Sequence, residues 1–513
     1  MQRIIYCQTA PQTGAFAANL ARLSRLASAF EAKDAVFTAP AGALEGGTGH
    51  DALAWEDVST RRDEALCAFA EETKKDGRRW VLPILREGAF DWVEISGGEA
   101  RSFTPPSDWP ALRTTSVLPW SPDVRPAQGT ALEGSIAGAE DRIVFAGGGR
   151  FAEKGRVLAE LTSWEEGVLL VERTNEGWRA SAKSVPTTLP PVRDPRYLAL
   201  VTAVRSYAEK SRASGVVLGL SGGVDSALVL SLAVDALGAE RVRTVMLPTD
   251  FTSSDSLEDA RTLAETLGVR HDVLPIRSLF ENVREALASE LAGRPWDVTE
   301  ENIQARLRGL LLMAYANKNG ALLLCTSNKG EAAMGYGTLY GDLTGGFAPL
   351  IDLWKREVYE LCRARNAWRP DIPERILTRA PSAELRPGQK DSDSLPDYDL
   401  IEKTLTHYLA KKTLRDLEGV DAETAREIVG RFTFNNFKRA QGIPGPILGL
   451  SPALSLAADW GLTRGCCTPN DEPREGGVRA AHQRFMRSKN SALVFVCFIL
   501  SRRNSIASSS SMS

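Results

Sequence analysis

The sequence lacks the features that mark a secreted, membrane-spanning or nucleic-acid-binding protein. A formal net charge of -3 leaves no basic excess for nucleic acid. The seven cysteines form no CxxC pair, so we expect free thiols in a reducing cytosol and no thiolate metal site. The N-terminus has no signal-peptide pattern, and the longest apolar run, Ala492 to Leu500, is too short to cross a bilayer. We therefore expect a cytoplasmic protein that binds neither membrane nor nucleic acid.

Length and composition describe a globular protein with more than one domain. At 513 residues the chain is too long for a single hydrophobic core, so two or three domains are expected. Its proportions of charged residues, 25%, and hydrophobic residues, 43%, are those of ordinary soluble proteins. A Pro-rich linker at residues 186–191 predicts a boundary. We predict domains at 1–190 and 191–463, with a possible last helix at 448–462, and a disordered tail at 464–513.

The first 190 residues alternate strand-like and helix-like segments. A strand from Arg3 to Gln8 precedes a helix from Phe16 to Ala32, and a second strand, Asp34 to Phe37, enters a loop rich in Gly and Ala. A helix near Arg61 to Lys75 and a strand from Trp80 to Leu85 follow. This alternation predicts an α/β layer fold.

The stretch at residues 215–237 organises the rest of the chain. A short β-branched run, suited to a strand buried on both faces, leads through the turn SGGVDS at residues 221–226 into a helical pattern. The glycines let the backbone approach an anion, and free N–H groups at the helix start can bind phosphate. Asp225 would repel a bare phosphate, so we interpret it as a ligand of a divalent cation that the phosphates share. An ordinary strand-to-helix turn explains the glycines but not both serines and Asp225.

Further strand–helix units follow this turn and predict a parallel sheet of four strands with ligands at their carboxyl ends. Glu331 follows the fourth strand, so it could join Asp225 in holding a cation. The glycine-rich loop at residues 335–342 contains two tyrosines suited to stacking a flat ring. Lys355 could reach a phosphate, although a solvated lysine explains it equally well.

A helical segment at residues 301–308 also carries candidate ligand-binding groups. It places Asn302, Arg306 and, more distantly, Gln304 toward one end of a helix. An arginine there could bind a phosphate or a carboxylate.

These motifs together resemble a known enzyme family. The turn SGGVDSA is the signature of the ATP pyrophosphatases, which split ATP between the α and β phosphates and activate a substrate as an adenylate. With ENIQARLRG, TSNKGEAAMGYGTLYGD, LWKREVY, PSAELRPGQKDSD and NNFKR, in this order from Asp194 to Gly445, the chain resembles NAD synthetase. The resemblance implies a doubly wound parallel-sheet domain that is Rossmann-like and adenine nucleotide alpha hydrolase-like. The region in front resembles a nitrilase-like α/β sandwich, as in the glutamine-dependent branch of the family.

The resemblance also implies roles for individual residues. It implies Asp225, Glu331 and Lys355 as catalytic residues, with Asp225 and Glu331 binding Mg²⁺. The residues implied for ATP are Gly219, Leu220, Ser221, Gly222, Gly223, Val224, Asp225, Ser226, Thr326, Lys355 and Ser382. The residues implied for deamido-NAD are Asn302, Arg306, Glu331, Asp342 and Lys438. A loop with Glu384, Gln389, Asp391 and Asp393 would order over the bound substrates, and the family's charged groups are replaced at Leu339 and Gly346.

The N-terminal region departs from the nitrilase-like pattern in its catalytic residues. Such domains hydrolyse an amide with a Glu, a Lys and a nucleophilic Cys. Ala41 stands where the Glu is expected, and no cysteine lies between Cys67 and Cys325. Cys7 and Cys67 are better explained as small buried residues than as nucleophiles. We therefore interpret the domain as a scaffold without hydrolytic chemistry.

The implied function is the ATP-dependent amidation of deamido-NAD to NAD⁺, with AMP and pyrophosphate as the other products. ATP is the co-substrate, Mg²⁺ the cofactor and free ammonia the expected nitrogen donor. One alternative is a glutamine-dependent NAD synthetase, and another is an inactive nucleotide-binding regulatory protein. A different ligase of the superfamily should lack the GYGTLYGD and PSAELRPGQKDSD blocks. The family also implies a homodimer.

Overall fold

The computed structural model describes residues 3–31, 34–46, 53, 55–86, 89–114, 128–140, 142–185 and 189–448. The expected tail at 464–513, and the expected helix at 448–462 beyond its first residue, lie outside these residues. Over the described ranges, no helix is long and apolar enough to cross a membrane. The domain boundaries at residues 190 and 463 remain predictions.

The N-terminal part is built on a seven-stranded mixed sheet. Its strand order is β13-β12-β1-β2-β3-β4-β5, in which β1, β2 and β3 run parallel and the outer strands pair antiparallel. The strands are β1 (Arg3–Gln8), β2 (Ala35–Thr38), β3 (Arg79–Arg86), β4 (Ala89–Ser96), β5 (Glu99–Ser102), β12 (Gly167–Thr174) and β13 (Gly177–Ser184). The α/β fold expected for this part is therefore confirmed.

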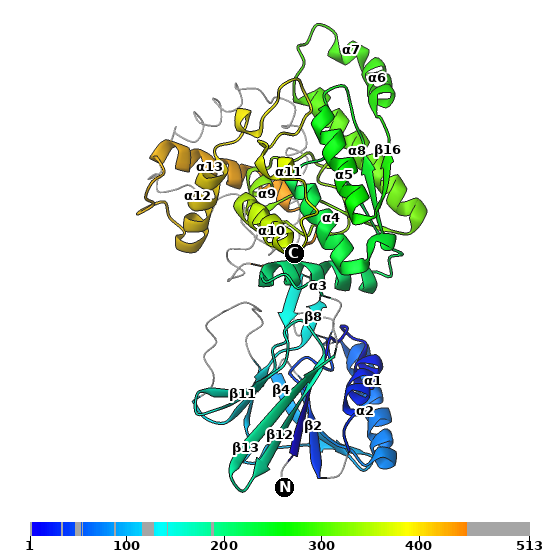
Figure 1. Cartoon of the computed structure of the whole chain (residues 1–513), viewed down its shortest axis with the longest axis vertical. Helices are drawn as coiled ribbons and strands as arrows, with labels where there is room; N and C mark the ends of the chain where they lie inside the picture. The colour runs from blue at the N-terminus through cyan, green and yellow to red at the C-terminus, as the bar shows by residue number, and fades with distance from the viewer. Residues whose placement is uncertain are drawn as a thin grey trace, which may run out of the picture. The chain divides into compact units, whose positions relative to one another are not determined.

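Two helices, α1 (Phe16–Ala27) and α2 (Glu56–Asp76), lie side by side along one face of this sheet (Figure 1). Their apolar residues pack on side chains such as Ile5 and Trp80. The helix predicted from Phe16 to Ala32 ends five residues earlier, and the helix predicted from Arg61 begins five residues earlier. The earlier start was missed because the first turn of α2 is acidic, which favours a helix N-terminus but adds nothing to the apolar pattern.

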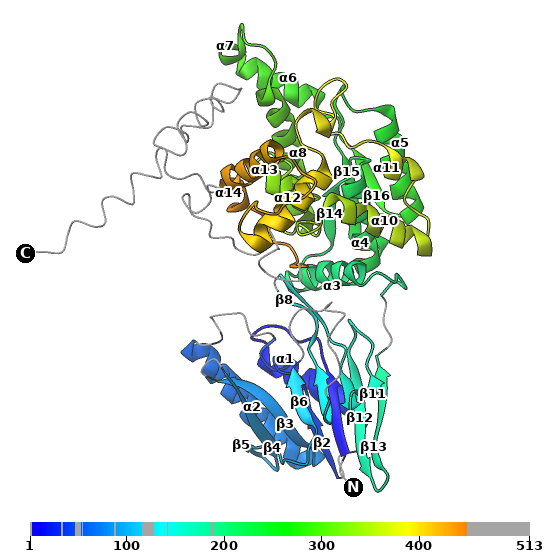
Figure 2. The same ribbon diagram turned by 90° about the vertical axis from the view of Figure 1, so that its left-hand side faces the viewer.

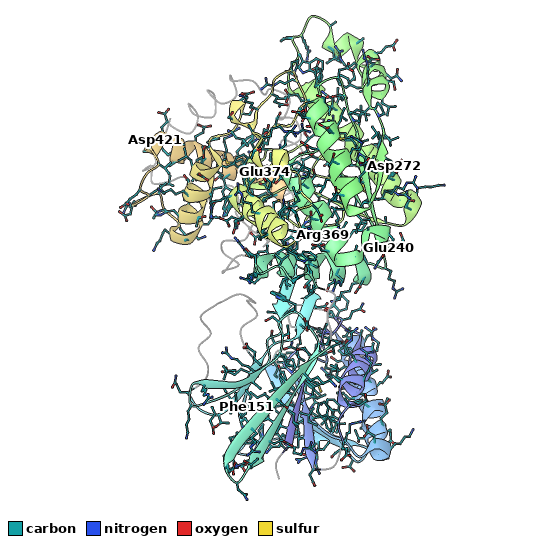
Figure 3. The ribbon with its side chains drawn as sticks, viewed as in Figure 1. Phe151, Glu240, Asp272, Arg369, Glu374 and Asp421 are labelled. Atoms are coloured by element: carbon teal, nitrogen blue, oxygen red, sulfur yellow. The ribbon has the colours of Figure 1, made fainter. Side chains whose placement is uncertain are left out.

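The other face of the seven-stranded sheet packs on a second, smaller sheet with the order β11-β10-β7-β6. Its strands are β6 (Ala111–Thr114), β7 (Ala131–Gly134), β10 (Arg150–Glu153) and β11 (Arg156–Glu160), and β8 (Ala137–Glu140) pairs with β9 (Ile143–Ala146). Phe151, labelled in Figure 3, is fully buried between the two sheets with Tyr6 and Leu132. This layer of sheet on sheet is the α/β sandwich that the sequence predicts.

The C-terminal part contains a four-stranded parallel sheet with the order β16-β15-β14-β17. Figure 2 labels three of its strands, β14, β15 and β16. Its strands are β14 (Val216–Gly219), β15 (Val242–Met246), β16 (Arg270–Val273) and β17 (Leu322–Leu324). The parallel sheet of four strands is confirmed, and β16 ends at Val273, after which residues 274–276 leave the sheet.

Helices cover both faces of the parallel sheet. The helices are α3 (Pro195–Lys210), α4 (Val224–Leu237), α5 (Ser254–Leu267), α6 (Arg277–Ala286), α7 (Ala288–Leu291), α8 (Val298–Asn319), α9 (Lys329–Met334), α10 (Lys355–Trp368), α11 (Glu374–Thr378), α12 (Tyr398–Lys411), α13 (Ala422–Phe434) and α14 (Asn436–Arg439). Leu218 faces the core formed with α3, α4, α5 and α10, whereas Val217 faces α8 on the other side. The sheet is therefore doubly wound, as the sequence predicts.

Candidate functional site

The turn between β14 and α4 is stabilised by hydrogen bonds to its own serine hydroxyl groups. The Ser221 backbone N–H donates to Ser226 Oγ at 3.2 Å, and Ser221 Oγ accepts from the Gly223 N–H at 3.2 Å. The two hydroxyls are 3.1 Å apart, and Ser226 Oγ also donates to the Gly223 carbonyl at 3.0 Å. The backbone N–H groups at the start of α4 thus lie together at the carboxyl edge of the sheet, where an anion can bind.

Gly222 is required by the shape of this turn. Its φ is +77°, a left-handed conformation that residues with a Cβ seldom adopt. A Cβ atom there would lie 2.4 Å from the Ser256 carbonyl oxygen, which is closer than any real contact. The turn therefore packs its backbone directly against α5.

Asp225, Lys355 and Glu331 form one charged group beside the turn. Asp225 lies in the first turn of α4, and Lys355 is the first residue of α10. Lys355 Nζ donates to Asp225 Oδ2 at 2.5 Å and to Glu331 Oε1 at 3.5 Å. Asn328 Nδ2 donates to Asp225 Oδ1 at 2.9 Å, and the Asn328 backbone N–H donates to Glu331 Oε2 at 3.2 Å. Two carboxylates therefore converge on one buried ammonium.

The electrostatics of this group follow from its burial. Burial raises the pKa of Glu331, the negative charge of Asp225 adds to the increase, and the Lys355 ammonium opposes it. Burial opposes the charged form of Lys355, but Asp225 and Glu331 outweigh it and raise the Lys355 pKa above its usual value. The ammonium thus compensates two carboxylates that would otherwise repel each other.

The same two carboxylates suit a hard divalent cation. Mg²⁺ is typically bound by one or two carboxylates together with substrate phosphates and water. Asp225 and Glu331 supply two carboxylates next to a phosphate-binding turn, and no group of three or more His, Cys, Asp or Glu side chains suited to a metal occurs among the described residues. The residues fit Mg²⁺ shared with phosphates better than a cation held by protein ligands alone.

A segment at residues 381–395, named the strap, is anchored beside this group. Asp391 is buried and accepts hydrogen bonds from Tyr336 at 3.2 Å and from Tyr398 at 2.9 Å. Lys355 Nζ lies 5.4 Å from the centre of the Tyr398 ring, so the strap anchor adjoins the charged group. Within the strap, the predicted ATP-binding residue Ser382 donates to the Gln389 carbonyl at 2.6 Å, and the predicted loop residue Asp393 pairs with Arg386 at 3.0 Å.

The strap also docks on the first turn of α5. Glu384 Oε1 accepts hydrogen bonds from the hydroxyls of Ser253 and Ser256 at 2.8 and 2.9 Å, and Glu384 Oε2 accepts from the Ser253 N–H at 3.2 Å. Arg379, just before the strap, donates to the Gly222 carbonyl at 3.1 Å. The strap is thereby connected to the backbone of the turn at residues 221–226.

The residues predicted for deamido-NAD form a second group around the glycine-rich loop. Asn302 Oδ1 accepts from Thr338 Oγ1 at 2.7 Å, and Arg306 Nε donates to the Leu339 carbonyl at 3.3 Å. Asp342 Oδ1 accepts from the Thr338 N–H at 2.8 Å. Lys438 Nζ donates to the carbonyls of Gly335 and Gly337, both at 2.7 Å. Glu331 is the predicted deamido-NAD residue that lies with Asp225 and Lys355 instead.

Two of the remaining predicted ATP residues, Gly219 and Thr326, lie at the same sheet edge as the turn. Leu218 of β14 pairs with Leu324 of β17. Leu220 and Thr326 each follow two residues later, so they lie at the same level of the sheet. Gly219 ends β14, and its Cα faces Leu312 of α8, since a Cβ there would lie 3.2 Å from Leu312 Cδ1. The structure thus brings Thr326 to the same edge as the turn, whereas Ser382 lies in the strap and donates to the Gln389 carbonyl.

Sequence reasoning missed several polar groups in this region. Asn328 bridges Asp225 and Glu331, and Tyr398 and Tyr336 anchor Asp391. Asn328 stands three residues before Glu331, the capping-box spacing that would have indicated its position. The Tyr336 contact joins residues 55 apart, and the Tyr398 contact joins residues seven apart in different elements, so neither follows from a local pattern.

Among the described N-terminal residues, the positions of Ala41 and the two cysteines bear on the expected hydrolytic residues. Ala41 stands in the loop after β2, and Cys7 is fully buried in β1 as predicted. The prediction that Cys67 is buried is wrong, because it lies on the exposed side of α2. Burial raises the pKa of the Cys7 thiol to about 12, so it is not a thiolate at neutral pH. Glu45 follows in the same loop, and burial raises its pKa to about 7.

Comparisons with known proteins agree with this geometry. Residues 197–442 match the family model described as NAD synthase. The glutamine-dependent NAD(+) synthetase of Acinetobacter baylyi is 45% identical over 274 residues, which are 52% of this chain and 50% of that protein. The corresponding enzyme of Rhodobacter capsulatus is 43% identical over 327 residues, 61% of this chain and 59% of that protein. The chain thus spans between half and three-fifths of the length of these curated relatives.

Solved structures resemble a larger share of the chain. The glutamine-dependent NAD⁺ synthetase from Acinetobacter baumannii, solved in complex with ADP, matches with a TM-score of 0.63 and 28% identity, covering 87% of this chain and 95% of that one. An enzyme of the same description from Cytophaga hutchinsonii matches with a TM-score of 0.65 at 17% identity, covering 86% and 94%, which shows the fold alone. Residues 197–442 thus resemble the NAD synthase family, and the chain as a whole resembles the structure of a glutamine-dependent NAD⁺ synthetase over 87% of its length.

Proposed function

We propose that this chain forms NAD⁺ by ATP-dependent amidation of deamido-NAD. The observation that carries the proposal is the turn at residues 221–226 with Asp225, Lys355 and Glu331 joined beside it. A turn at a helix N-terminus, one ammonium and two carboxylates suit a triphosphate with its cation. The match of residues 197–442 to the NAD synthase family supports the same reaction.

The reaction proceeds in two steps. The nicotinate carboxylate of deamido-NAD attacks the α-phosphorus of ATP, a bond to the β-phosphate oxygen breaks, and pyrophosphate leaves. Ammonia then attacks the activated carboxyl carbon, loses a proton, and AMP leaves with the former carboxylate oxygen. No side-chain nucleophile is required, so the protein mainly positions two anionic substrates that would otherwise repel each other.

The chain's own groups have separate tasks in these steps. The N–H groups of the turn and the Lys355 ammonium stabilise negative charge that develops on the phosphates. Asp225 and Glu331 would hold Mg²⁺, which supplies further charge neutralisation when bound. Asn302, Arg306, Asp342 and Lys438, gathered at the glycine-rich loop, would orient the dinucleotide.

Two nitrogen donors have support. The names of the relatives favour glutamine, and this alternative fits the comparisons better than free ammonia. Ala41 in place of the expected Glu and the lack of any cysteine between Cys67 and Cys325 favour ammonia. Since the deciding chemistry is amide hydrolysis, only a donor comparison separates the two.

The experiment is a product analysis with each donor in turn. The purified chain is incubated with deamido-NAD, ATP, Mg²⁺ and either ammonium or ammonia-free glutamine, and nucleotides are separated by chromatography. We expect NAD⁺, AMP and pyrophosphate in equal amounts with at least one donor. Formation of ADP and phosphate, or no product with either donor, would reject the proposal and support the inactive nucleotide-binding alternative. Equal rates with glutamine would assign glutaminase activity and reject the ammonia reading.

A further inference from the structure

Arg308 of α8 is a cation that the predicted site does not use. Its Nε donates to the Leu247 carbonyl at 2.9 Å, and among the described residues neither terminal nitrogen has a partner. The other deeply placed arginines differ: Arg365 pairs with Asp235 and Asp371, and Arg439 donates to two carbonyls through its terminal nitrogens. A guanidinium carries five N–H donors, so Arg308 keeps four of them available.

The position of Arg308 follows from the strand register. Gly219 of β14 pairs with Val245 of β15, so Leu247 lies level with Ser221, the first residue of the turn. One helical turn further along α8, Leu312 packs on Gly219 at the end of β14. Arg308 therefore lies just beyond the carboxyl edge of the sheet, level with the turn at residues 221–226.

Arg308 and the turn reach this edge from opposite faces of the sheet. The turn leads into α4, which packs on the face that contains Leu218. Arg308 belongs to α8, which packs on the face that contains Val217 and Val245. A group bound at the turn would thus meet backbone N–H donors from one side and a guanidinium from the other.

The strap covers the same part of α8. Gln304, one helical turn before Arg308, is fully buried and donates through Nε2 to the Leu385 carbonyl of the strap at 3.0 Å. Its Oε1 is buried without a hydrogen-bond partner, so this face of α8 offers an unused acceptor beside the unused donors of Arg308. Burial lowers the pKa of Arg308 to about 10. The negative charges of Asp342 and Glu384 act in the opposite direction, although neither carboxylate forms an ion pair with Arg308 among the described residues. Arg308 still carries its charge at neutral pH.

We infer that Arg308 binds the phosphate chain of the nucleotide at the carboxyl edge of the parallel sheet. An incompletely paired guanidinium at a phosphate-binding turn is best satisfied by phosphate oxygens, which accept two parallel N–H bonds from arginine. The inference rests on the proposed function for the presence of ATP, and it adds a phosphate-binding residue from the face opposite the turn.

Binding measurements without turnover test the inference. The affinities of adenosine, AMP and ATP with Mg²⁺ are measured by calorimetry for the full chain and for Arg308→Gln, Arg308→Lys and the control Lys318→Gln, which removes a charge from an exposed position of the same helix. Loss of charge-assisted hydrogen bonds predicts a roughly ten- to hundredfold weaker affinity for ATP in Arg308→Gln, little change for adenosine, and a smaller loss in Arg308→Lys. Circular dichroism and thermal melting report whether each variant is folded.

The outcomes separate this inference from the proposed function. An unchanged affinity for ATP in folded Arg308→Gln, or an equal loss for adenosine and ATP, would overturn the inference. If the unmodified chain binds ATP through Arg308 but forms no NAD⁺, the inference holds and the proposed reaction fails. If Arg308→Gln does not fold but Arg308→Lys does, weaker ATP binding by Arg308→Lys with unchanged adenosine binding supports the inference. Unchanged ATP binding by Arg308→Lys rejects it.

Discussion

For single residues, the charge balance of the site depends on which cations and N–H donors contact its buried carboxylates. Asp225 and Glu331 share the ammonium of Lys355, and Asn328 donates to both. Glu45 in the N-terminal part is also buried and also has a raised pKa, but it accepts a hydrogen bond from a backbone N–H and, among the described residues, forms no ion pair with an ammonium. The two cases lead to different predictions.

Asp225→Asn should remove most of the synthetase activity. The amide cannot bind a divalent cation as a carboxylate does, and it leaves Lys355 paired with Glu331 alone. We expect kcat to fall by at least about a hundredfold, the scale of lost transition-state charge stabilisation. The measurement is steady-state NAD⁺ formation.

The matched control is Asp416→Asn, at an exposed turn position with φ of +62° that both residues tolerate. It should leave kcat unchanged. An Asp225→Asn variant with more than a tenth of the original activity would contradict the metal-binding role.

Glu45 should make the stability of the N-terminal part depend on pH. Its Oε1 accepts from the Leu85 N–H at 2.7 Å, and its Oε2 is buried without a partner. The folded pKa of about 7 lies above the ordinary value of 4.5, so the folded state binds the proton more tightly than the unfolded state. Stability from this group is therefore present below about pH 4.5 and is lost as the pH rises through 7, by about 3 kcal/mol.

Glu45→Gln should remove this part of the pH dependence. From pH 5 to pH 8, the free energy of unfolding of the original chain should fall relative to that of Glu45→Gln. Urea denaturation at each pH measures both values. Glu99→Gln, at a fully exposed strand position, should show no such trend. Parallel pH profiles for Glu45→Gln and the original chain would contradict the shifted pKa.

At the scale of elements, the turn between β14 and α4 depends on close backbone packing. Gly222→Ala would add the strain of a left-handed φ and a Cβ 2.4 Å from the Ser256 carbonyl oxygen. Gly293 has a similar φ of +72° but open space around a Cβ, so Gly293→Ala isolates the conformational strain of about 1–2 kcal/mol.

We expect Gly293→Ala to lose stability only, and Gly222→Ala to lose more stability and to raise the KM for ATP, since the turn must move away from α5. Thermal melts and ATP titrations measure the two effects. Equal stability losses with an unchanged KM would show that the turn does not need its close approach to α5.

The sequence predicts elements better than the contacts between them. The strand and helix on either side of the turn follow from an unbroken apolar run and a helical apolar spacing, and both are confirmed. Helix α8 begins at Val298 rather than Glu301, because the capping box of Asp297 and Glu300 fixes its start in a charged segment without apolar pattern. Arg308, two residues after the predicted Arg306, could be recognised only from the register that places Leu247 beside it.

At the scale of the whole molecule, the exposed face of α8 supports the expected homodimer. Leu310 and Met313 lie on this face with 65% and 36% of their surface exposed, and a second copy could cover them. We expect a mass of twice 55.7 kDa by light scattering, and a shift toward the single-chain mass in Leu310→Lys. Val273→Lys, at another exposed apolar position, should keep the dimer. A single-chain mass for the unmodified protein would contradict the prediction.

The central claim for the whole molecule is that the nicotinate carboxylate is activated as an adenylate. Its most direct test is the fate of oxygen. Deamido-NAD labelled with ¹⁸O in the nicotinate carboxylate is converted with ATP, Mg²⁺ and a nitrogen donor, and the products are analysed by mass spectrometry. The account predicts AMP that contains one ¹⁸O atom and pyrophosphate that contains none. Label in pyrophosphate or phosphate, or unlabelled AMP, would contradict it.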